Sequence, residues 1–252
     1  MKLAEKVAVV TGAGRGIGRA IALKFAEEGA AVTVNDIELS FAESTASRIV
    51  RSGGRALAIR ADVSDGAQVK RMFEQSAEKF GRIDILVNNA GVRKDAMSHE
   101  MTDRDWDAVV DTSLKGSMNC IRAAEKFMLK QNYGRVVNIS SPLPPAIAGK
   151  GHAGYAVASS GLYGLTRSLS VELGPHNITV NCIAPDFIDT EMTRSTARNE
   201  GLYLEDLKKF AVAAIPLRRL GTVADVSALA LFIVSDEAGF ITGQVINIKG
   251  GP

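Results

Sequence analysis

The feature that most constrains this chain is a glycine-rich segment, Thr11 to Gly18, between an apolar run and a helical pattern. The apolar run is Val7 to Val10, and the pattern from Arg19 to Glu28 is typical of a helix. A strand, a glycine turn and a helix start in that order bind phosphate groups, because the exposed N–H groups and dipole of the helix attract their charge. A glycine cluster alone is weak evidence, since tight turns use glycine without any ligand.

An acidic residue strengthens this interpretation. Asp36 ends the next apolar strand, Ala31 to Asn35, about 20 residues after the turn, a separation at which a carboxylate reaches an adenosine ribose. The turn and Asp36 together predict a dinucleotide site. The cofactor-binding residues expected in the turn are Gly12, Arg15, Gly16, Ile17 and Gly18.

Composition places the chain among ordinary globular proteins. It has 252 residues, 46% of them hydrophobic, and a net charge of +2. No basic cluster indicates nucleic acid, and no apolar run approaches the roughly 18–20 residues of a membrane span. Residues 1–6 lack a signal-peptide pattern, and Cys120 and Cys182 are typical of buried thiols in a reducing compartment, so a cytoplasmic location is expected. The histidines and cysteines show no metal-ligand spacing, and no metal is expected.

Strands and helices alternate along the whole chain, and no linker or repeat divides it. Several strands are continuous apolar runs, which is typical of a parallel sheet covered on both faces. We therefore expect one doubly wound α/β domain over residues 1–252. Strands are expected at residues 7–10, 31–35, 56–60, 83–88, 134–139, 179–183 and 244–248, and helices after the first at 39–52, 66–80, 103–131, 154–173 and 223–235.

Several motifs together resemble the short-chain dehydrogenase/reductases, close to the branch of the 3-oxoacyl-(acyl-carrier-protein) reductases. The match covers nearly the whole chain. The resemblance implies a Rossmann-type seven-stranded parallel sheet in the order 3-2-1-4-5-6-7, with a nicotinamide cofactor across the carboxyl ends of the strands. The residues that carry it are Thr11 to Gly18, Asp62-Val63, Asn88 to Gly91, Ser141 with Tyr155, Pro185 to Thr190, and Thr242 to Gln244.

The resemblance implies further cofactor contacts. Asp62 and Val63 would meet the adenine, and Asn89, Ala90 and Gly91 would let the backbone approach the adenosine ribose. A purely structural role, in which the side chain links neighbouring strands, fits Asn88 or Asn89 equally well. After Pro185, the backbone of Ile188 and the hydroxyl of Thr190 would lie near the carboxamide. The family usually has glycine after this proline, where this chain has Asp186.

The preferred cofactor can be argued from charge. The Asp36 carboxylate can accept hydrogen bonds from both ribose hydroxyls, but it would repel a 2′-phosphate of about −2 charge. Ile37 is apolar where relatives that prefer NADP commonly carry arginine. We therefore expect NAD(H) as the preferred cofactor. Arg15 in the glycine turn is compatible with NADP(H) as well, because a basic residue there often accompanies NADP use. The Arg15 side chain fits equally a solvated position or a surface ion pair.

The catalytic residues depart from the family pattern. The resemblance implies that Tyr155 exchanges the hydroxyl proton and that Ser141, favoured over Ser140 by alignment, hydrogen-bonds the substrate oxygen. The family has a lysine four residues after the tyrosine, and this chain has Ser159 there. The resemblance implies that Ser159 can still form a hydrogen bond with the nicotinamide ribose, but a serine supplies no charge. Ser113 stands where the family has an asparagine whose bound water links the lysine to solvent, so both changes affect one proton relay.

The missing lysine has a quantitative consequence. Tyrosine has an unperturbed pKa of about 10, and a nearby cation lowers such a pKa by roughly 1–3 units. Losing the lysine therefore puts most of the acid–base contribution at stake, which is about 10²–10⁴-fold. Lys150 and His152 precede Tyr155 and are candidate replacements, although solvated loop positions are the favoured interpretation of both.

Partners and substrate are less determined. The proline-rich loop from Ser141 to Ala148 and a substrate lid at about residues 190–215 favour a small, largely apolar carbonyl or alcohol, or an acyl thioester. Arg194, Arg198, Lys208 and Lys209 are candidates for meeting a carrier protein, with a solvated helix face as the favoured alternative. Small residues on the tyrosine-bearing helix predict a homotetramer or homodimer.

Three functions remain in view. The favoured one is an NAD(H)-dependent oxidoreductase that interconverts a carbonyl and a secondary alcohol with Tyr155 and Ser141, with activity weakened by Ser159. The second is a catalytically impaired nucleotide-binding homologue that acts as a sensor or partner subunit. The third is a non-redox lyase that reuses the same pocket. Retention of the serine, the tyrosine and the cofactor motifs favours the first.

Overall fold

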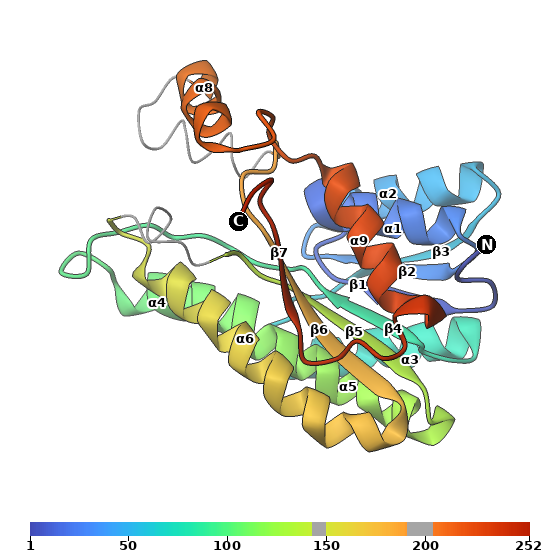
Figure 1. Cartoon of the computed structure of the whole chain (residues 1–252). Helices are drawn as coiled ribbons and strands as arrows, with labels where there is room; N and C mark the ends of the chain where they lie inside the picture. The colour runs from blue at the N-terminus through green and yellow to red at the C-terminus, as the bar shows by residue number, and fades with distance from the viewer. Residues whose placement is uncertain (143–149, 191–203) are drawn as a thin grey trace.

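The computed structural model describes residues 1–142, 150–190 and 204–252. Its centre is a seven-stranded parallel sheet in the order β3-β2-β1-β4-β5-β6-β7, which confirms the expected topology (Figure 1). Every residue of β1, β2, β4 and β6 is buried, as their continuous apolar runs indicated. The strands are β1 Val7–Val10, β2 Ala31–Asp36, β3 Arg55–Arg60, β4 Ile85–Asn88, β5 Gly134–Ile139, β6 Ile178–Pro185 and β7 Val245–Ile248.

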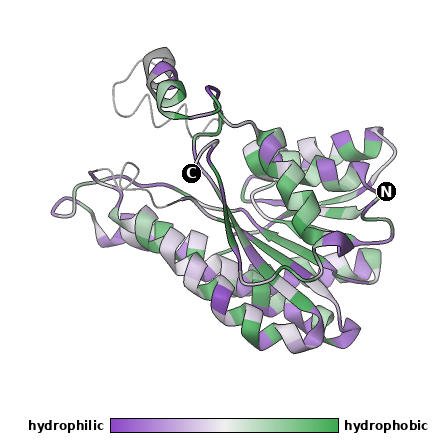
Figure 2. Cartoon of the chain, in the orientation of Figure 1, coloured by the Kyte–Doolittle hydropathy of each residue, from purple (hydrophilic) through white to green (hydrophobic). Residues whose placement is uncertain are grey.

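Helices cover both faces of the sheet, and each face has its own hydrophobic core. One core joins α1, α2 and α9 to the sheet, and the other joins α3, α5 and α6. The hydropathy colours of Figure 2 show hydrophobic residues concentrated along the strands, while α8 stands away from both layers in Figure 1. The helices are α1 Gly16–Glu27, α2 Leu39–Arg51, α3 Gly66–Phe80, α4 Asp103–Val110, α5 Gly116–Gln131, α6 Ala153–Leu173, α8 Leu204–Ala214 and α9 Val223–Val234.

The expected single helix over residues 103–131 is wrong in one respect. A π-helical segment, η1 Asp111–Lys115, separates α4 from α5, and the Gly116 N–H donates to the carbonyl of Asp111 five residues back. The Ser117 hydroxyl also donates to the Ser113 carbonyl at 2.6 Å. The other predicted strands and helices are present, with ends that differ by at most three residues.

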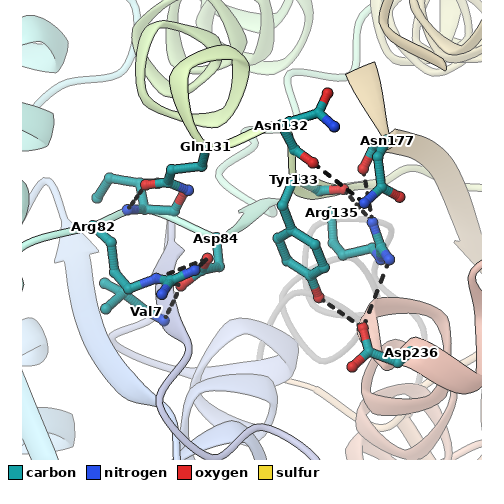
Figure 3. Close-up of polar contacts among 11 residues, drawn as sticks. Val7, Arg82, Asp84, Gln131, Asn132, Tyr133, Arg135, Asn177 and Asp236 are labelled. Carbon is teal, nitrogen blue, oxygen red and sulfur yellow. Dashed lines mark hydrogen bonds and ion pairs between the residues drawn. The ribbon is translucent and has the colours of Figure 1, made fainter. Parts of the chain in front are cut away.

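A network of charged side chains closes the amino edge of the sheet (Figure 3). The buried Asp84 carboxylate pairs with Arg82 at 2.6 Å and accepts a hydrogen bond from the Val7 N–H at 2.9 Å. Arg135 is buried at the start of β5, donates to the Asn177 carbonyl and lies 3.7 Å from Asp236. These partners compensate for the burial of charge at the edge opposite to the carboxyl ends of the strands.

Candidate active site

The glycine turn lies between β1 and the start of α1. Gly12 and Gly16 have φ of +58° and +56°, a region that favours glycine. A Cβ added to Gly16 would meet no described atom within 4 Å, so the turn is open where α1 begins. A Cβ on Gly18 would instead lie 2.4 Å from Asn89 Nδ2, so glycine lets the helix approach the end of β4. The open helix start is a suitable position for an anionic group.

Asn89 and Thr11 hold this turn in place. Asn89 Nδ2 donates to the carbonyls of Thr11 and Gly12, both at 3.0 Å. In return, Thr11 Oγ1 accepts hydrogen bonds from the N–H groups of Asn89 and Ala90, both at 3.0 Å. Asn88 Nδ2 donates to Asn138 Oδ1 on β5 at 2.9 Å. Both asparagines therefore link strands, and Thr11, to which the sequence assigned no such role, takes part in the linkage.

The Asp36 carboxylate packs against the glycine turn. Its Oδ2 accepts a hydrogen bond from the Gly14 N–H at 3.0 Å, and its Oδ1 accepts one from the Glu38 N–H at 3.2 Å. A Cβ at Gly14 would lie 2.5 Å from Asp36 Oδ2, so only glycine allows this approach. The two parts of the predicted dinucleotide site, distant in sequence, are thus adjacent in space.

Two arginines lie beside the turn. Arg15 precedes α1, and its guanidinium carbon lies 5.5 Å from the centre of the Phe41 ring on α2. Arg19, which was not among the predicted site residues, donates from Nε to Thr45 Oγ1 at 3.1 Å and contacts the Gly14 carbonyl. Ile37 is 54% exposed. Positive charge is therefore present near Asp36, although neither arginine pairs with that carboxylate in the hydrogen bonds described.

The loops after β3 and β4 continue the same edge. Asp62 Oδ1 accepts hydrogen bonds from the Ser64 N–H at 2.9 Å and the Ser64 hydroxyl at 2.7 Å, and Val63 is buried beside Gly116. Gly91 is exposed, and a Cβ there would lie 3.4 Å from Ser113 Oγ. The β4 loop therefore lies against η1, where the second family departure is located.

The loop after β6 begins at Pro185 and is fastened at two points. Ile188 is buried and forms an isolated parallel bridge with Gly221, and Asp189 pairs with Lys208 of α8 at 3.4 Å. Lys208 therefore has an ion-pair partner within the chain. Of the expected lid, residues 191–203 lie outside the described residues, as do residues 143–149 of the proline-rich loop.

Asp186 follows Pro185, at the position where the resemblance led us to expect glycine. Its Oδ1 is buried and has no hydrogen-bond partner among the described residues. Burial raises the pKa of this carboxyl above its usual range, and Lys249 opposes the shift. The departure thus adds a carboxyl group whose charged form is disfavoured at the exit of β6.

The predicted catalytic residues lie on two segments that are bonded to each other. Ser141 is buried just after β5, and its carbonyl accepts a hydrogen bond from the Tyr163 hydroxyl of α6 at 2.6 Å. The Ser140 hydroxyl donates to the Ser159 carbonyl at 3.1 Å. Tyr155 is half-buried in the first turn of α6, and Ser159 is buried one turn later. The exit of β5 and the start of α6 are thus held together.

A cation contacts the tyrosine that the sequence predicts to be catalytic. The guanidinium carbon of Arg93, in the loop after β4, lies 5.6 Å from the centre of the Tyr155 ring. His152 Nε2 contacts Arg93 and lies 3.9 Å from Asp95 Oδ2. Lys150 is exposed. Of the two predicted candidates for a cation near Tyr155, His152 lies in this cluster. Arg93 was not predicted, because no sequence spacing relates residue 93 to residue 155.

Metal ligands, long apolar helices and thiols are the other features considered in the described residues. In the three described ranges, no group of three or more His, Cys, Asp or Glu side chains could hold a metal ion. Within the same ranges, no helix is both long and apolar enough to cross a membrane. Cys120 and Cys182 are buried free thiols, and burial raises the pKa of each to about 12, so both are protonated at neutral pH.

Known proteins match this chain over nearly its whole length. The family model described as Enoyl-(Acyl carrier protein) reductase matches residues 12–252. A 3-oxoacyl-(acyl-carrier-protein) reductase from Staphylococcus epidermidis is 41% identical over 98% of both chains. The (2S)-((R)-hydroxy(phenyl)methyl)succinyl-CoA dehydrogenase subunit BbsD from Thauera aromatica is 38% identical over 100% of this chain and 98% of its own.

Solved structures give the same picture. A short-chain alcohol dehydrogenase from Sinorhizobium meliloti 1021 superposes with a TM-score of 0.91 and 38% identity, covering 99% of this chain and 96% of the other. Levodione reductase superposes with a TM-score of 0.93 and 32% identity, covering 98% and 97% of the two chains. Both the sequence and the fold of these proteins match over nearly their whole lengths.

Proposed function

This chain belongs to the short-chain dehydrogenase/reductase superfamily of oxidoreductases, which interconvert carbonyls and alcohols with a nicotinamide cofactor, and we propose that it uses NAD(H) with Tyr155 as acid–base and Ser141 holding the substrate oxygen. The observation that carries the proposal is the linkage of the β5 exit to the start of α6. Two hydrogen bonds, from Ser140 to Ser159 and from Tyr163 to Ser141, join the segments that bear these two side chains.

The described residues fit a dinucleotide. Gly12 and Gly16 form an open turn at a helix N-terminus, and the Asp36 carboxylate lies against that turn, where it can accept hydrogen bonds from ribose hydroxyls. When bound, the nicotinamide would accept or supply a hydride. We assign Asp62, Val63, Asn89, Ala90 and Gly91 to the adenosine half, and Pro185, Ile188, Thr190 and Ser159 to the nicotinamide half.

The proton chemistry falls to the protein. During reduction, the Tyr155 hydroxyl gives its proton to the carbonyl oxygen of the substrate, and during oxidation the tyrosinate takes it back. The Ser141 hydroxyl donates a hydrogen bond to the same oxygen and fixes its position. The buried Ser141 and half-buried Tyr155 suit these roles, because a partly desolvated site strengthens both interactions.

We propose an acyl thioester as the substrate class. Two relatives, a 3-oxoacyl-(acyl-carrier-protein) reductase and the (2S)-((R)-hydroxy(phenyl)methyl)succinyl-CoA dehydrogenase subunit BbsD, are both named for acyl groups on thioester carriers. The reacting group would be a carbonyl or hydroxyl on the acyl chain.

The test combines NADH binding with a panel of 3-oxoacyl thioesters and simple ketones. We expect NADH-dependent reduction that Tyr155→Phe abolishes. Tyr133→Phe is the matched control, because it removes a tyrosine hydroxyl at the opposite edge of the sheet, where that hydroxyl donates to Asp236. Full activity in Tyr155→Phe would refute the assignment.

A second function, that of a partner subunit, is favoured by the name of one relative, because the Thauera protein is a subunit of its dehydrogenase. Ser159 and Ser113, at the positions where the resemblance led us to expect the family's proton relay, agree with this alternative. A partner subunit of a larger enzyme would bind NADH yet leave the whole panel unreduced from about pH 6 to about pH 10. That result would replace the first proposal with the second.

A further inference from the structure

Arg93 is placed to act on Tyr155. Its guanidinium carbon lies 5.6 Å from the centre of the tyrosine ring, within the range of a cation–π contact. The Arg93 side chain is only 18% exposed, so water screens this contact less than it would at the surface. The contact joins the loop after β4 to the first turn of α6.

Neighbouring groups fix the arginine in this position. Arg93 Nε lies 2.6 Å from Asp95 Oδ2, and His152 Nε2 contacts the guanidinium from the other segment. The Ala96 N–H donates to the Gly151 carbonyl at 3.0 Å, which ties the two loops together beside the cluster. The arginine is therefore held by both segments that meet at Tyr155.

We propose that Arg93 supplies the positive charge that the chain lost with the lysine at position 159, and so favours the tyrosinate form of Tyr155. This inference rests on the proposed role of Tyr155. A phenolate spreads its negative charge over the ring, so a cation near the ring gains attraction when the hydroxyl ionises. Arginine suits the task because its guanidinium stays charged throughout the working range of pH. Arg93 is a positioning residue, since it acts through Tyr155.

The other charged groups near Tyr155 modify this effect. Asp95 offsets part of the Arg93 charge, His152 adds charge when protonated, and Tyr163 lies close enough to interact electrostatically with Tyr155. On the segments packed against this end of α6, Lys94 pairs with Asp105 at 4.0 Å and Lys115 pairs with Asp111 at 3.3 Å. Among the charged side chains of the described residues, Arg93 is the one with a cation–π contact to the Tyr155 ring.

The test begins with the tyrosinate absorbance of the cofactor-free protein as a function of pH. Subtracting the curve of Tyr155→Phe isolates one tyrosine of the four in the chain. We expect Arg93→Gln to move this titration about one pH unit toward alkaline, and Arg93→Lys to restore most of the shift. Lys94→Gln is the matched control, because it removes an equal charge from the same loop and should leave the curve in place.

The pH–rate profile of alcohol oxidation supplies the second readout. Arg93→Gln should lower the rate at neutral pH about tenfold and shift the alkaline rise in parallel with the absorbance. An unchanged titration of Tyr155 would overturn the inference. A change in KM alone would also overturn it and would make Arg93 a substrate-binding residue. If Arg93→Gln does not fold, Asp95→Asn decides: removal of the offsetting carboxylate should move the titration toward lower pH, and any other result counts against the proposal.

The two proposals fail in different ways. Turnover that does not depend on Tyr155 would refute the proposed function, whatever Arg93 does. Turnover that depends on Tyr155 but ignores Arg93 would refute this inference and leave the proposed function standing.

Discussion

At the scale of single residues, the Asp36 carboxylate should decide between the two nicotinamide cofactors. It is held by the N–H groups of Gly14 and Glu38, and a 2′-phosphate in the same place would meet its negative charge. We therefore predict tighter binding of NADH than of NADPH, with the difference shrinking in Asp36→Ala and Asp36→Asn. Titration of nicotinamide fluorescence measures both affinities. Glu38→Gln, which removes an exposed carboxylate two residues away, should keep the preference; equal or tighter NADPH binding by the unaltered protein would make Arg15 the deciding residue.

Restoring the family lysine is the second residue-scale prediction. Ser159→Lys should shift the rise of alcohol oxidation to lower pH and increase the neutral rate, provided that the side chain finds room in this buried position. The gain should be larger in an Arg93→Gln background, since the two cations act on one hydroxyl. Adding Ser113→Asn should help further if the water relay re-forms. Ser47→Lys places the same charge on an exposed residue of α2, away from Tyr155, and should change little; equal effects from both lysines would contradict a local mechanism.

Contacts that follow from the strand order could be predicted from the sequence, and contacts that depend on the paths of loops could not. The proximity of Asp36 to the glycine turn follows from strand order, because the ends of adjacent parallel strands meet at one edge. The contact of Arg93 with Tyr155 depends on the paths of two loops, and no spacing rule relates positions 93 and 155. Asn89 shows a third case: its type was noticed, but its bonds to Thr11 and Gly12 required the coordinates.

At the scale of elements, the start of α9 carries a testable local interaction. Thr222 caps the helix by accepting from the Asp225 N–H, and Asp225 in return accepts from the Thr222 N–H at 2.7 Å. Thr222→Ala should therefore lower the free energy of unfolding by about 1 kcal/mol at neutral pH. Chemical denaturation monitored by circular dichroism measures it; an unchanged midpoint would show that the cap contributes nothing.

The pH dependence of this cap has a definite sign. Bonds to Arg219 and Thr222 hold the pKa of Asp225 well below its usual range. A carboxylate with a lowered folded pKa stabilises the protein above its unfolded pKa, near 4, and loses that contribution as pH falls. Asp225→Asn should therefore cost stability at neutral pH, and its difference from the unaltered protein should narrow in acid. A difference that widens in acid would refute the assignment.

Elements were predictable where one physical signal dominated. Most strands are buried apolar runs, whereas β3 and β7, at the two edges of the sheet, are partly exposed. The apolar patterns predicted the number of the strands and their order along the chain. The π-helical segment η1 was missed, and the residue that follows it, Gly116, has a tertiary contact with Val63, because a Cβ there would lie 2.7 Å from Val63 Cγ2. No periodicity within residues 103–131 reports that contact.

At the scale of the whole molecule, we propose that residues 1–252 form one domain that assembles into a tetramer, or at least a dimer. An exposed face of α6 presents small and apolar residues at helical spacing: Val157, Ser160, Gly164, Ser168 and Val171. Light scattering should give a multiple of 26.7 kDa. Gly164→Arg is a clean test, because a Cβ there meets no described atom within 4 Å and the monomer can accept a side chain. We expect it to reduce the assembly; a monomer before any substitution would refute the prediction.

The strand order also has a consequence for the time course of synthesis. β1 lies in the middle of the sheet between β2 and β4, so its second edge stays open until the ribosome has released residue 88. β7 pairs with β6 only when residues 245–248 are free. The nascent chain therefore carries an exposed apolar strand edge until these residues are translated, and sequence-distant pairing of this kind slows folding and favours aggregation. Chaperone dependence during expression is the expected cost of putting the first strand at the centre.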